Sequence, residues 1–242
     1  MPNDVASPLT PAAPPTSYDA LACVIPCYNA GARVAQVVAN TLRYCPRVIV
    51  VNDGSTDGAV ESLRTLPITV VDFPVNRGKG HALLAGIREA LRHPEVEIVC
   101  TLDADGQHDP AEIPRLYEIM QREEADFVIG ARRFDKQHVP RRSRVGNRVT
   151  AQVMQALFGV RMEDTQCGFR MIRRALAEHL VTEVQGGRYE TEMQMLLKAF
   201  LSGARIVPVP IQTLYEPGNV SSHFRKLRDS LRVLYALLRA RL

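Results

Sequence analysis

The sequence lacks any paired-cysteine pattern. Its five cysteines are odd in number and widely spread, at positions 23, 27, 45, 100 and 167, and no two of them form a C-x-x-C pair. This spacing argues against both a disulfide framework and a zinc knuckle, and it suits a reducing compartment. We therefore expect a cytoplasmic protein whose cysteines are unpaired.

A secretory leader and a long apolar run are missing as well. The opening residues, MPNDVASPLTPAAPPTSYDA, are rich in proline, contain the acid Asp4 and have no apolar core. We expect residues 1–19 to be a disordered lead-in and not a signal peptide. No uncharged apolar run reaches the roughly 18 residues of a membrane span, so contact with a membrane would be peripheral, on its inner face.

Two common nucleotide-binding signatures are also lacking. The segment NRGKG (76–80) precedes a predicted helix but does not have the G-x-x-x-x-G-K-[ST] spacing of a P-loop, and no strand leads into G-x-G-x-x-G. A dinucleotide-binding Rossmann domain is thereby disfavoured. Residues 76–80 could cradle a phosphate at the helix N-terminus, but the simpler interpretation is a turn whose glycines allow close helix packing.

The net charge of +4 is unevenly distributed. Residues 130–150 carry seven basic side chains against one acid, and residues 219–242 carry six against one, which leaves 17 basic and 24 acidic residues elsewhere. Local basicity of this kind indicates an anionic partner such as phosphate groups, nucleic acid or a lipid surface. Nucleic acid is not expected, because the basic segments lack interleaved aromatic residues and a known binding motif.

Short β-branched runs alternate with helical stretches over residues 20–220, and no domain boundary interrupts them. The pattern predicts an α/β domain with a Rossmann-like, mostly parallel sheet that helices cover on both faces. The proline-broken segment 205–215 predicts an edge strand. The predicted strands are 21–26, 47–51, 68–73, 97–103 and 126–131. The predicted helices are 31–43, 58–65, 79–93, 110–123, 145–159, 172–181 and 189–202.

Polar clusters follow three of the predicted strands: PCYN (26–29), NDGSTDG (52–58) and DADGQH (103–108). Ligands of open α/β sheets bind at the carboxyl ends of strands. In an extended segment Asp103 and Asp105 would share a face, and Gln107 would join them if Gly106 bends the chain. Oxygen ligands of this kind suit Mg²⁺ or Mn²⁺. An acidic turn without a ligand is the alternative, because D-x-D alone is too short to be specific.

Two further aspartates have predicted structural roles in these loops. Asp109, followed by Pro110 and Glu112, has the pattern of a helix N-cap. Asp57 is expected to cap the short helix predicted at 58–65.

The order of these segments is more specific than any one of them. VIPCYN, VVNDGSTDG, NRGKGHALLAGI, LDADGQHDP, GAR and DTQCGFR follow one another between about residues 21 and 230. In this order they resemble the family 2 glycosyltransferases of the GT-A fold, and within that family the polyprenyl- or dolichyl-phosphate mannosyl- and glucosyltransferases. The resemblance implies an inverting enzyme that moves a hexose from a UDP- or GDP-linked donor to a lipid phosphate.

The resemblance also implies roles for individual residues. Pro26, Tyr28 and Asp53 would hold the nucleotide base. The divalent metal, Mg²⁺ or Mn²⁺, would bind Asp103, Asp105 and Gln107 and thereby stabilise charge on the leaving diphosphate. Arg132 of GAR would contact phosphate, and Arg142 would supply a second such arginine by a looser match. His108 receives no role.

The acceptor side departs from the usual pattern. Many relatives carry an E-D pair whose aspartate removes a proton, whereas this chain reads GGRYETEMQM, with Glu190 and Glu192. A phosphate acceptor is already largely anionic at neutral pH, so no strong base is required. Alternatively, Glu190 or Glu192 is the catalytic base for a hydroxyl of another lipid or glycan, or both lie on a helix surface. Asp164 and Arg170 are expected near the acceptor. A catalytically silent nucleotide-sugar-binding protein is a third hypothesis.

The segment 221–242 predicts an amphipathic basic helix. Phe224, Leu227, Leu231, Leu234, Leu238 and Leu242 recur at steps of three and four, with basic residues beside them. Such a helix could lie on an anionic membrane surface through residues 222–242. It could equally pack on the protein body or form the seam of a homodimer.

Overall fold

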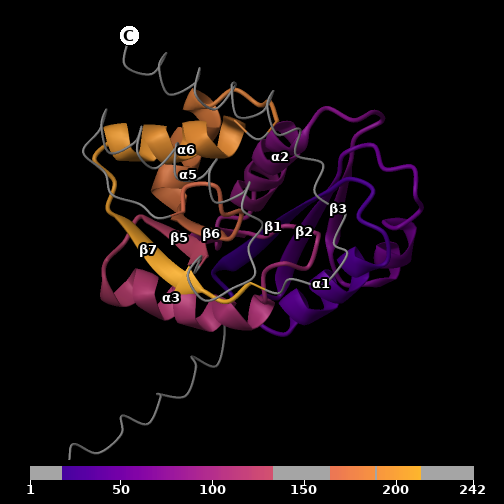
Figure 1. Cartoon of the computed structure of the whole chain (residues 1–242), viewed down its shortest axis with the longest axis horizontal. Helices are drawn as coiled ribbons and strands as arrows, with labels where there is room; N and C mark the ends of the chain where they lie inside the picture. Colours follow the sequence, from indigo (N-terminus) through magenta and orange to yellow (C-terminus); the bar gives the residue numbers. More distant parts are fainter. Residues whose placement is uncertain (1–17, 133–163, 189, 214–242) are drawn as a thin grey trace, which may run out of the picture.

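The computed structural model describes residues 18–132, 164–188 and 190–213. These residues form one seven-stranded sheet with helices on both faces (Figure 1). The strands are β1 (Leu21–Cys27), β2 (Arg47–Asn52), β3 (Thr69–Asp72), β4 (Ile98–Thr101), β5 (Phe127–Arg132), β6 (Arg170–Arg173) and β7 (Ile206–Ile211).

The spatial order of the strands is β3-β2-β1-β4-β6-β5-β7. All neighbours are parallel except β6, which runs antiparallel to both β4 and β5. The predicted mostly parallel sheet is therefore confirmed, including the placement of the proline-broken segment at an edge. Pro208 and Pro210 of β7 are exposed, and an edge strand tolerates residues that cannot donate a ladder hydrogen bond.

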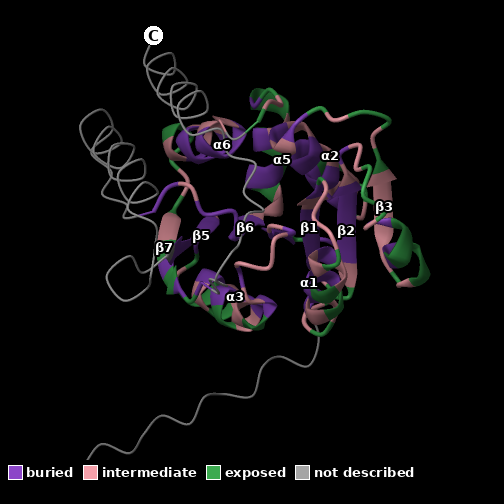
Figure 2. Cartoon of the chain, turned by 45° about the vertical axis from the view of Figure 1, so that its right-hand side comes forward, coloured by how far each residue is buried: buried purple, intermediate pink, exposed green. Residues whose placement is uncertain are grey.

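The helices of the described residues lie in two layers. Figure 2 shows α2, α5 and α6 on one face of the sheet and α1 and α3 on the other. Their bounds are α1 (Arg33–Leu42), α2 (Lys79–Leu91), α3 (Ile113–Arg122), α5 (Arg174–Glu183) and α6 (Glu190–Leu201), with short 3-10 turns η1 (Glu61–Thr65) and η2 (Pro110–Glu112).

The structure corrects two local predictions, on the helix at 58–65 and on Asp57, and confirms a third, on Asp109. The helix predicted from residue 58 is only the turn η1, which begins at Glu61. Asp57 does not cap it; its carboxylate accepts from the Ala59 amide at 3.1 Å and from the Gly31 amide at 2.8 Å, so it joins two loops. Asp109 does cap η2, because it accepts from the Ala111 amide at 2.9 Å with Pro110 following it.

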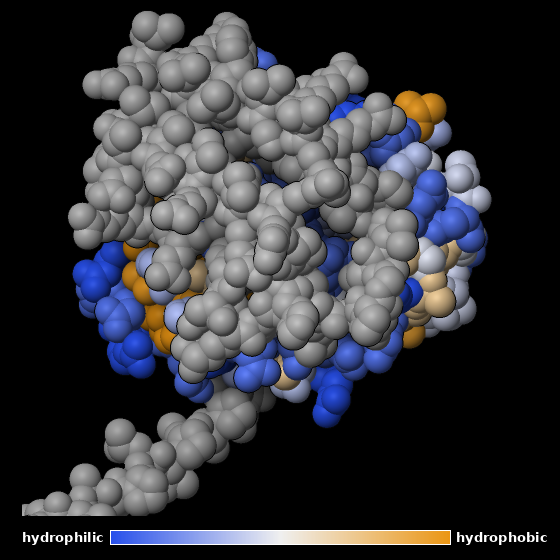
Figure 3. All heavy atoms as spheres, viewed as in Figure 1, coloured by the Kyte–Doolittle hydropathy of each residue, from blue (hydrophilic) through white to orange (hydrophobic). Residues whose placement is uncertain are grey.

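The core lies between the sheet and its two helical layers. Strands β1, β2 and β4 are buried almost throughout (Figure 2), as expected of parallel strands covered on both sides. All five cysteines are buried free thiols. At the surface, hydrophobic side chains gather in separate groups among hydrophilic ones on the face shown in Figure 3.

Within the residues that the structure describes, no helix is long and apolar enough to cross a bilayer. The predicted helix 145–159, the C-terminal helix 221–242 and Arg142 lie outside the described residues. So does most of each basic segment.

Candidate active site

The polar segments that follow β1 and β2 meet at one edge of the sheet, because these strands are parallel neighbours. The Asn29 amide donates to Ser55 Oγ at 3.1 Å, and Asn29 Oδ1 accepts from the Thr56 amide at 2.8 Å. Pro26 lies within β1, and Tyr28 just beyond the strand is exposed. The predicted base-binding segments are thus held together, with the partly exposed ring of Tyr28 beside them.

Asp53 organises the neighbouring turn. Its carboxylate is only 2% exposed and accepts from the Arg77 amide at 2.6 Å, the Gly78 amide at 2.9 Å and Asn76 Nδ2 at 2.9 Å. Burial raises the pKa of this carboxyl, and the hydrogen bonds from Arg77 and Gly78 oppose the rise. Asp53 therefore positions residues 76–78, while its contact with a nucleotide base stays a prediction.

The D-x-D segment after β4 is a turn and not an extended stretch. Asp105 Oδ1 accepts from the Gln107 amide at 3.0 Å, and Gly106 adopts a positive φ of 74°. The argument that Asp103 and Asp105 share a face because they are two residues apart in a strand is therefore wrong. The turn still keeps Asp103, Asp105 and Gln107 within five residues at the carboxyl end of β4.

Asp103 lies against the loop that precedes β6. A Cβ atom added to Gly168 would lie 2.5 Å from Asp103 Oδ2, so a larger residue there would require the Asp103 side chain to shift. Thr101 Oγ1 also donates to the Gly168 carbonyl at 2.7 Å. The DTQCGFR segment is thereby fixed beside the first aspartate of the D-x-D turn.

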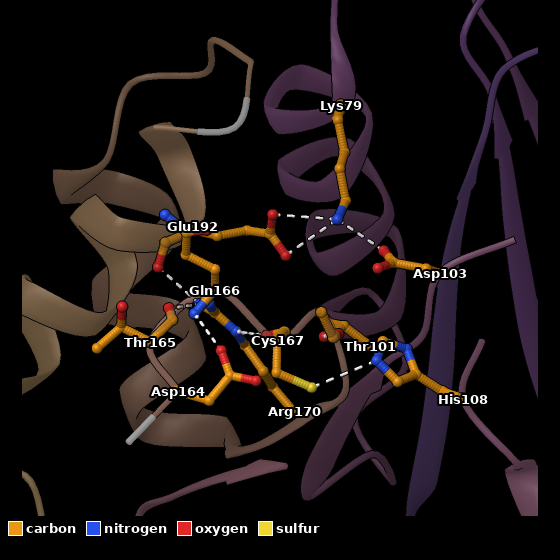
Figure 4. A network of polar contacts seen from close by, with 11 residues as sticks. Lys79, Thr101, Asp103, His108, Asp164, Thr165, Gln166, Cys167, Arg170 and Glu192 are labelled. Atoms are coloured by element: carbon orange, nitrogen blue, oxygen red, sulfur yellow. Dashed lines mark hydrogen bonds and ion pairs between the residues drawn. The ribbon is translucent and has the colours of Figure 1, made fainter. Parts of the chain in front are cut away.

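The ammonium of Lys79 joins two carboxylates from distant parts of the chain (Figure 4). Its Nζ lies 2.6 Å from Asp103 Oδ1 and 3.0 Å from Glu192 Oε2. The side chains of Lys79, Asp103 and Glu192 are 20%, 24% and 7% exposed. Burial alone lowers the pKa of Lys79, but the two carboxylates outweigh it and the pKa is raised. The lysine is therefore a fixed cation.

Sequence reasoning missed Lys79. It interpreted NRGKG as a packing turn or a phosphate cradle made by backbone amides, without a role for the lysine, and the glycines do have the packing role. The Gly80 amide donates to the Gly187 carbonyl at 3.0 Å, and a Cβ atom on Gly80 would overlap Thr191 Oγ1. One signal was available: Lys79 is the first residue of α2, where the helix dipole disfavours a cation. A lysine at this position therefore predicts nearby carboxylates that offset the repulsion.

Arg170 joins two segments of the chain, and its place near the acceptor stays a prediction. It is fully buried and donates to the carbonyls of Cys167 at 2.8 Å, Thr165 at 3.2 Å and Glu192 at 2.6 Å. Arg170 thus joins the loop before β6 to the first turn of α6. Asp164 is likewise buried, and its Oδ1 accepts from the Gln166 amide at 3.1 Å.

His108, which has no predicted role, strengthens the same junction. Its Nε2 lies 3.4 Å from Cys167 Sγ, and its ring lies against Phe169. The D-x-D turn and the DTQCGFR loop are therefore in contact on both sides of Gly168, as Figure 4 shows for Asp103, Cys167 and His108.

The remaining predicted residues are only partly described. Arg132 ends β5, and because β4 and β5 both run antiparallel to β6, its backbone reaches the same edge of the sheet as Asp103. Glu190 and Glu192 begin α6. Glu192 pairs with Lys79, whereas Oε2 of Glu190 is buried and has no hydrogen-bond partner among the described residues.

The donor atoms at the D-x-D turn are all oxygens, from two carboxylates and one amide. Within the described ranges, no group of three or more His, Cys, Asp or Glu side chains is placed to hold a metal by itself. This set fits Mg²⁺ or Mn²⁺, which are commonly held by one or two carboxylates together with phosphate oxygens and water. A cation here would need a ligand to complete its coordination.

The chain is similar to known proteins over most of its length. The family model described as Glycosyl transferase family 2 matches residues 22–181. A UDP-N-acetylglucosamine–dolichyl-phosphate N-acetylglucosaminyltransferase of Methanococcus voltae is 26% identical, covering 79% of this chain and 84% of that protein. The polyprenol monophosphomannose synthase of Mycolicibacterium smegmatis is 30% identical, over 78% and 75%.

Among solved structures, the glucosyl-3-phosphoglycerate synthase of Mycobacterium tuberculosis superposes with a TM-score of 0.70. The match covers 93% of this chain and 79% of that one, at 20% sequence identity. At this identity the likeness establishes the fold alone, and it confirms the predicted GT-A architecture.

Proposed function

The chain belongs to glycosyl transferase family 2, and from this premise we propose that it moves a hexose from a nucleoside-diphosphate sugar to a polyprenyl phosphate. The observation that carries the proposal is the placement of Asp103. Its partly exposed carboxylate lies at the carboxyl end of β4, between the fixed cation of Lys79 and the loop containing Gly168. The relatives from Methanococcus voltae and Mycolicibacterium smegmatis, which are named for dolichyl-phosphate and polyprenol substrates, support the acceptor class.

The donor side follows from the segments at the edge of the sheet. Tyr28 would stack on the nucleotide base beside the turn that Asp53 organises, and Pro26 would shape that pocket. Asp103, Asp105 and Gln107 would hold Mg²⁺ or Mn²⁺, which when bound supplies positive charge to the leaving diphosphate. The related Mycobacterium tuberculosis synthase was crystallised with Mn²⁺ and UDP, which supports this assignment.

The reaction would be a single displacement with inversion. An oxygen of the acceptor phosphate forms a bond to the anomeric carbon while the bond from that carbon to the donor diphosphate breaks, and the electron pair leaves with the diphosphate. Because a phosphate monoester is largely ionised at neutral pH, no proton has to be removed. The chain would hold the acceptor phosphate and the donor diphosphate on opposite sides of the anomeric carbon and would balance their negative charge. Arg132 and Arg142 are the proposed phosphate contacts.

The direct test is a panel of UDP- and GDP-linked sugars offered with undecaprenyl or dolichyl phosphate, with and without Mn²⁺. We expect one donor to release its nucleoside diphosphate in a metal- and acceptor-dependent manner. Asp103→Asn should lower that rate by at least about a hundredfold, since losing one well-placed electrostatic contact has that effect on kcat. Full activity of Asp103→Asn in the presence of a chelator would refute the metal assignment.

One observation favours a second candidate function. Oε2 of Glu190, which has no hydrogen-bond partner in the part of the chain that the structure describes, could accept a proton from a hydroxyl, which a phosphate acceptor does not require. Transfer to a hydroxyl of another lipid or glycan, with Glu190 as the base, is therefore the alternative. Glu192 is less suited to that role, because Lys79 already binds its carboxylate. The kcat of Glu190→Gln on the acceptor that the wild type uses decides between the two: unchanged kcat on polyprenyl phosphate supports the phosphate acceptor, and a strong loss on a hydroxyl acceptor supports the base.

A further inference from the structure

The contact between Lys79 and Asp103 has a consequence for metal binding. Asp103 Oδ1 accepts from the ammonium at 2.6 Å, which is short even for a hydrogen bond between charged partners. The same carboxylate is the one proposed to hold the divalent cation. A divalent cation and the ammonium would therefore compete for this carboxylate.

Glu192 is the second carboxylate that pairs with the Lys79 ammonium. Its two oxygens lie 3.1 Å and 3.0 Å from Lys79 Nζ, so the carboxylate already meets the ammonium through both. Glu192 is itself held from behind, because its carbonyl accepts from Arg170 at 2.6 Å. Loss of Asp103 as a partner would thus leave the ammonium with one complete ion pair and would not strand a buried charge, which is the costly outcome.

The lysine is also held at a position where a cation is unfavourable. Lys79 is the first residue of α2, and the positive end of the helix dipole repels its charge. Close packing of Gly78 and Gly80 against Gly187, Arg188 and Thr191 fixes that end of the helix. Asp103 and Glu192 together offset the repulsion, so the ammonium occupies its place because both carboxylates are present.

We propose that Lys79 is a resident counter-ion of the metal site, which neutralises Asp103 until the divalent cation arrives and then pairs with Glu192 alone. This inference rests on the proposed function, since it takes Asp103 as a metal ligand. It follows that the free protein binds divalent cations weakly. Efficient binding requires the added negative charge of a nucleoside diphosphate, so metal and donor bind as one unit.

The test is the affinity of the full chain for Mn²⁺ alone, measured by isothermal titration calorimetry or by the EPR signal of free Mn²⁺, without nucleotide. In Lys79→Met the competing cation is gone and two carboxylates face each other, so we expect Mn²⁺ to bind about tenfold more tightly than in the wild type. Arg77→Met is the matched control. The side chain of Arg77 lies over Phe73, so this substitution removes one positive charge from the same turn. It should leave the affinity for Mn²⁺ within about twofold of the wild-type value.

Glu192→Gln should act in the opposite direction. Without Glu192 the ammonium has Asp103 as its carboxylate partner, so it should hold that oxygen more firmly and Mn²⁺ should bind more weakly than in the wild type. If the two substitutions merely damaged the fold, they would not change the affinity for Mn²⁺ in opposite directions. If Lys79→Met does not fold, as judged by circular dichroism, the Glu192→Gln result decides: weaker binding supports the proposal, and unchanged binding overturns it.

The outcomes separate this inference from the proposed function. If folded Lys79→Met binds Mn²⁺ no more tightly than the wild type, while Asp103→Asn weakens Mn²⁺ binding in the presence of UDP, the counter-ion role is overturned and the metal site stands. If Asp103→Asn leaves Mn²⁺ binding with UDP unchanged, the metal assignment fails and the lysine role fails with it.

Discussion

At the residue scale, buried polar groups define this site more clearly than exposed ones. Asp53, Arg170 and Glu192 are almost entirely buried, and each joins segments that are far apart in the sequence. A buried polar group is stable only when its hydrogen bonds are satisfied. Replacing such a residue should therefore disturb the loops that it joins as well as its own position.

Asp53 offers the first prediction. Asp53→Asn keeps the size of the side chain, but its amide nitrogen replaces one of the two carboxylate oxygens and cannot accept, so the backbone amide of either Arg77 or Gly78 loses its partner. We expect the free energy of unfolding to fall by about 1–3 kcal/mol, the cost of leaving a buried donor unsatisfied. Urea denaturation measures this directly. Asp72→Asn, at an exposed carboxylate, is the control and should lose less than about 1 kcal/mol. Equal losses would show that the turn does not depend on Asp53.

Cys27 leads to a prediction about pH. Burial raises the pKa of its thiol to about 11, from an ordinary value of 9.0. Below pH 9 both the folded and the unfolded chain keep this proton. Between pH 9 and 11 only the unfolded chain releases it, so the free energy of unfolding should fall as pH rises, by about 1.4 kcal/mol per pH unit at most for this group.

The measurement for Cys27 is urea unfolding at pH 8 and at pH 10. Cys27→Ala is the control, because it removes the titrating group while the other buried thiols remain. We expect its loss of stability between the two pH values to be smaller than that of the wild type. The same loss in both proteins would mean that Cys27 does not contribute to the alkaline sensitivity.

At the scale of elements, the contact between the start of α2 and the start of α6 sets the geometry of the site. It depends on glycine, because a Cβ atom on Gly80 would overlap Thr191 Oγ1 and lie 2.8 Å from the Arg188 carbonyl. The two helix ends carry Lys79 and Glu192. Their separation is thus fixed by backbone packing before any charge is considered.

Gly80→Ala tests that packing. In an ordinary helix the change would stabilise by up to about 1 kcal/mol, but here overpacking should cost about 1–3 kcal/mol. Thermal or urea unfolding measures the difference. Ala85→Gly, in the middle of the same helix, isolates the effect of helix propensity and should cost about 1 kcal/mol. A stabilised Gly80→Ala would contradict the close approach of α2 and α6.

The strands and helices also show what the sequence could predict. β1, β2 and β4 are nearly continuous apolar runs that contain β-branched residues, and such runs identify buried parallel strands. β6 was missed because Arg170–Arg173 is a four-residue strand that leads directly into α5, so its second half was assigned to a helix beginning at 172. Lys79 was missed for another reason: its partner Glu192 is 113 residues away, and periodicity carries no information about such contacts.

At the scale of the whole molecule, the uneven charge leads to a prediction about membranes. The segment 222–242 lies outside the described residues, and its amphipathic pattern predicts a helix on an anionic lipid surface. The full chain should float with vesicles containing phosphatidylglycerol and less with neutral vesicles. Replacing Leu231 and Leu238 by Asp should abolish flotation, because it removes two members of the apolar stripe.

The alternatives for this segment give different results. If it packs on the body, the Leu231 and Leu238 replacements should lower the melting temperature without changing flotation. If it forms a dimer seam, sedimentation velocity of the wild type should show a dimer that the double variant loses. If the wild-type protein does not float with anionic vesicles, the membrane assignment is contradicted.

The reversed direction of β6 determines which loops can meet. Had β6 run parallel to β4, the loop before it would have entered from the opposite edge of the sheet, about the length of a strand away from Asp103. Because β6 runs antiparallel, Gly168 and Cys167 arrive beside the D-x-D turn. The polarity of one short strand therefore places the later half of the chain within reach of the earlier half. With Thr101 bonded to Gly168 across that junction, the two halves should move as a single block, without a hinge between them.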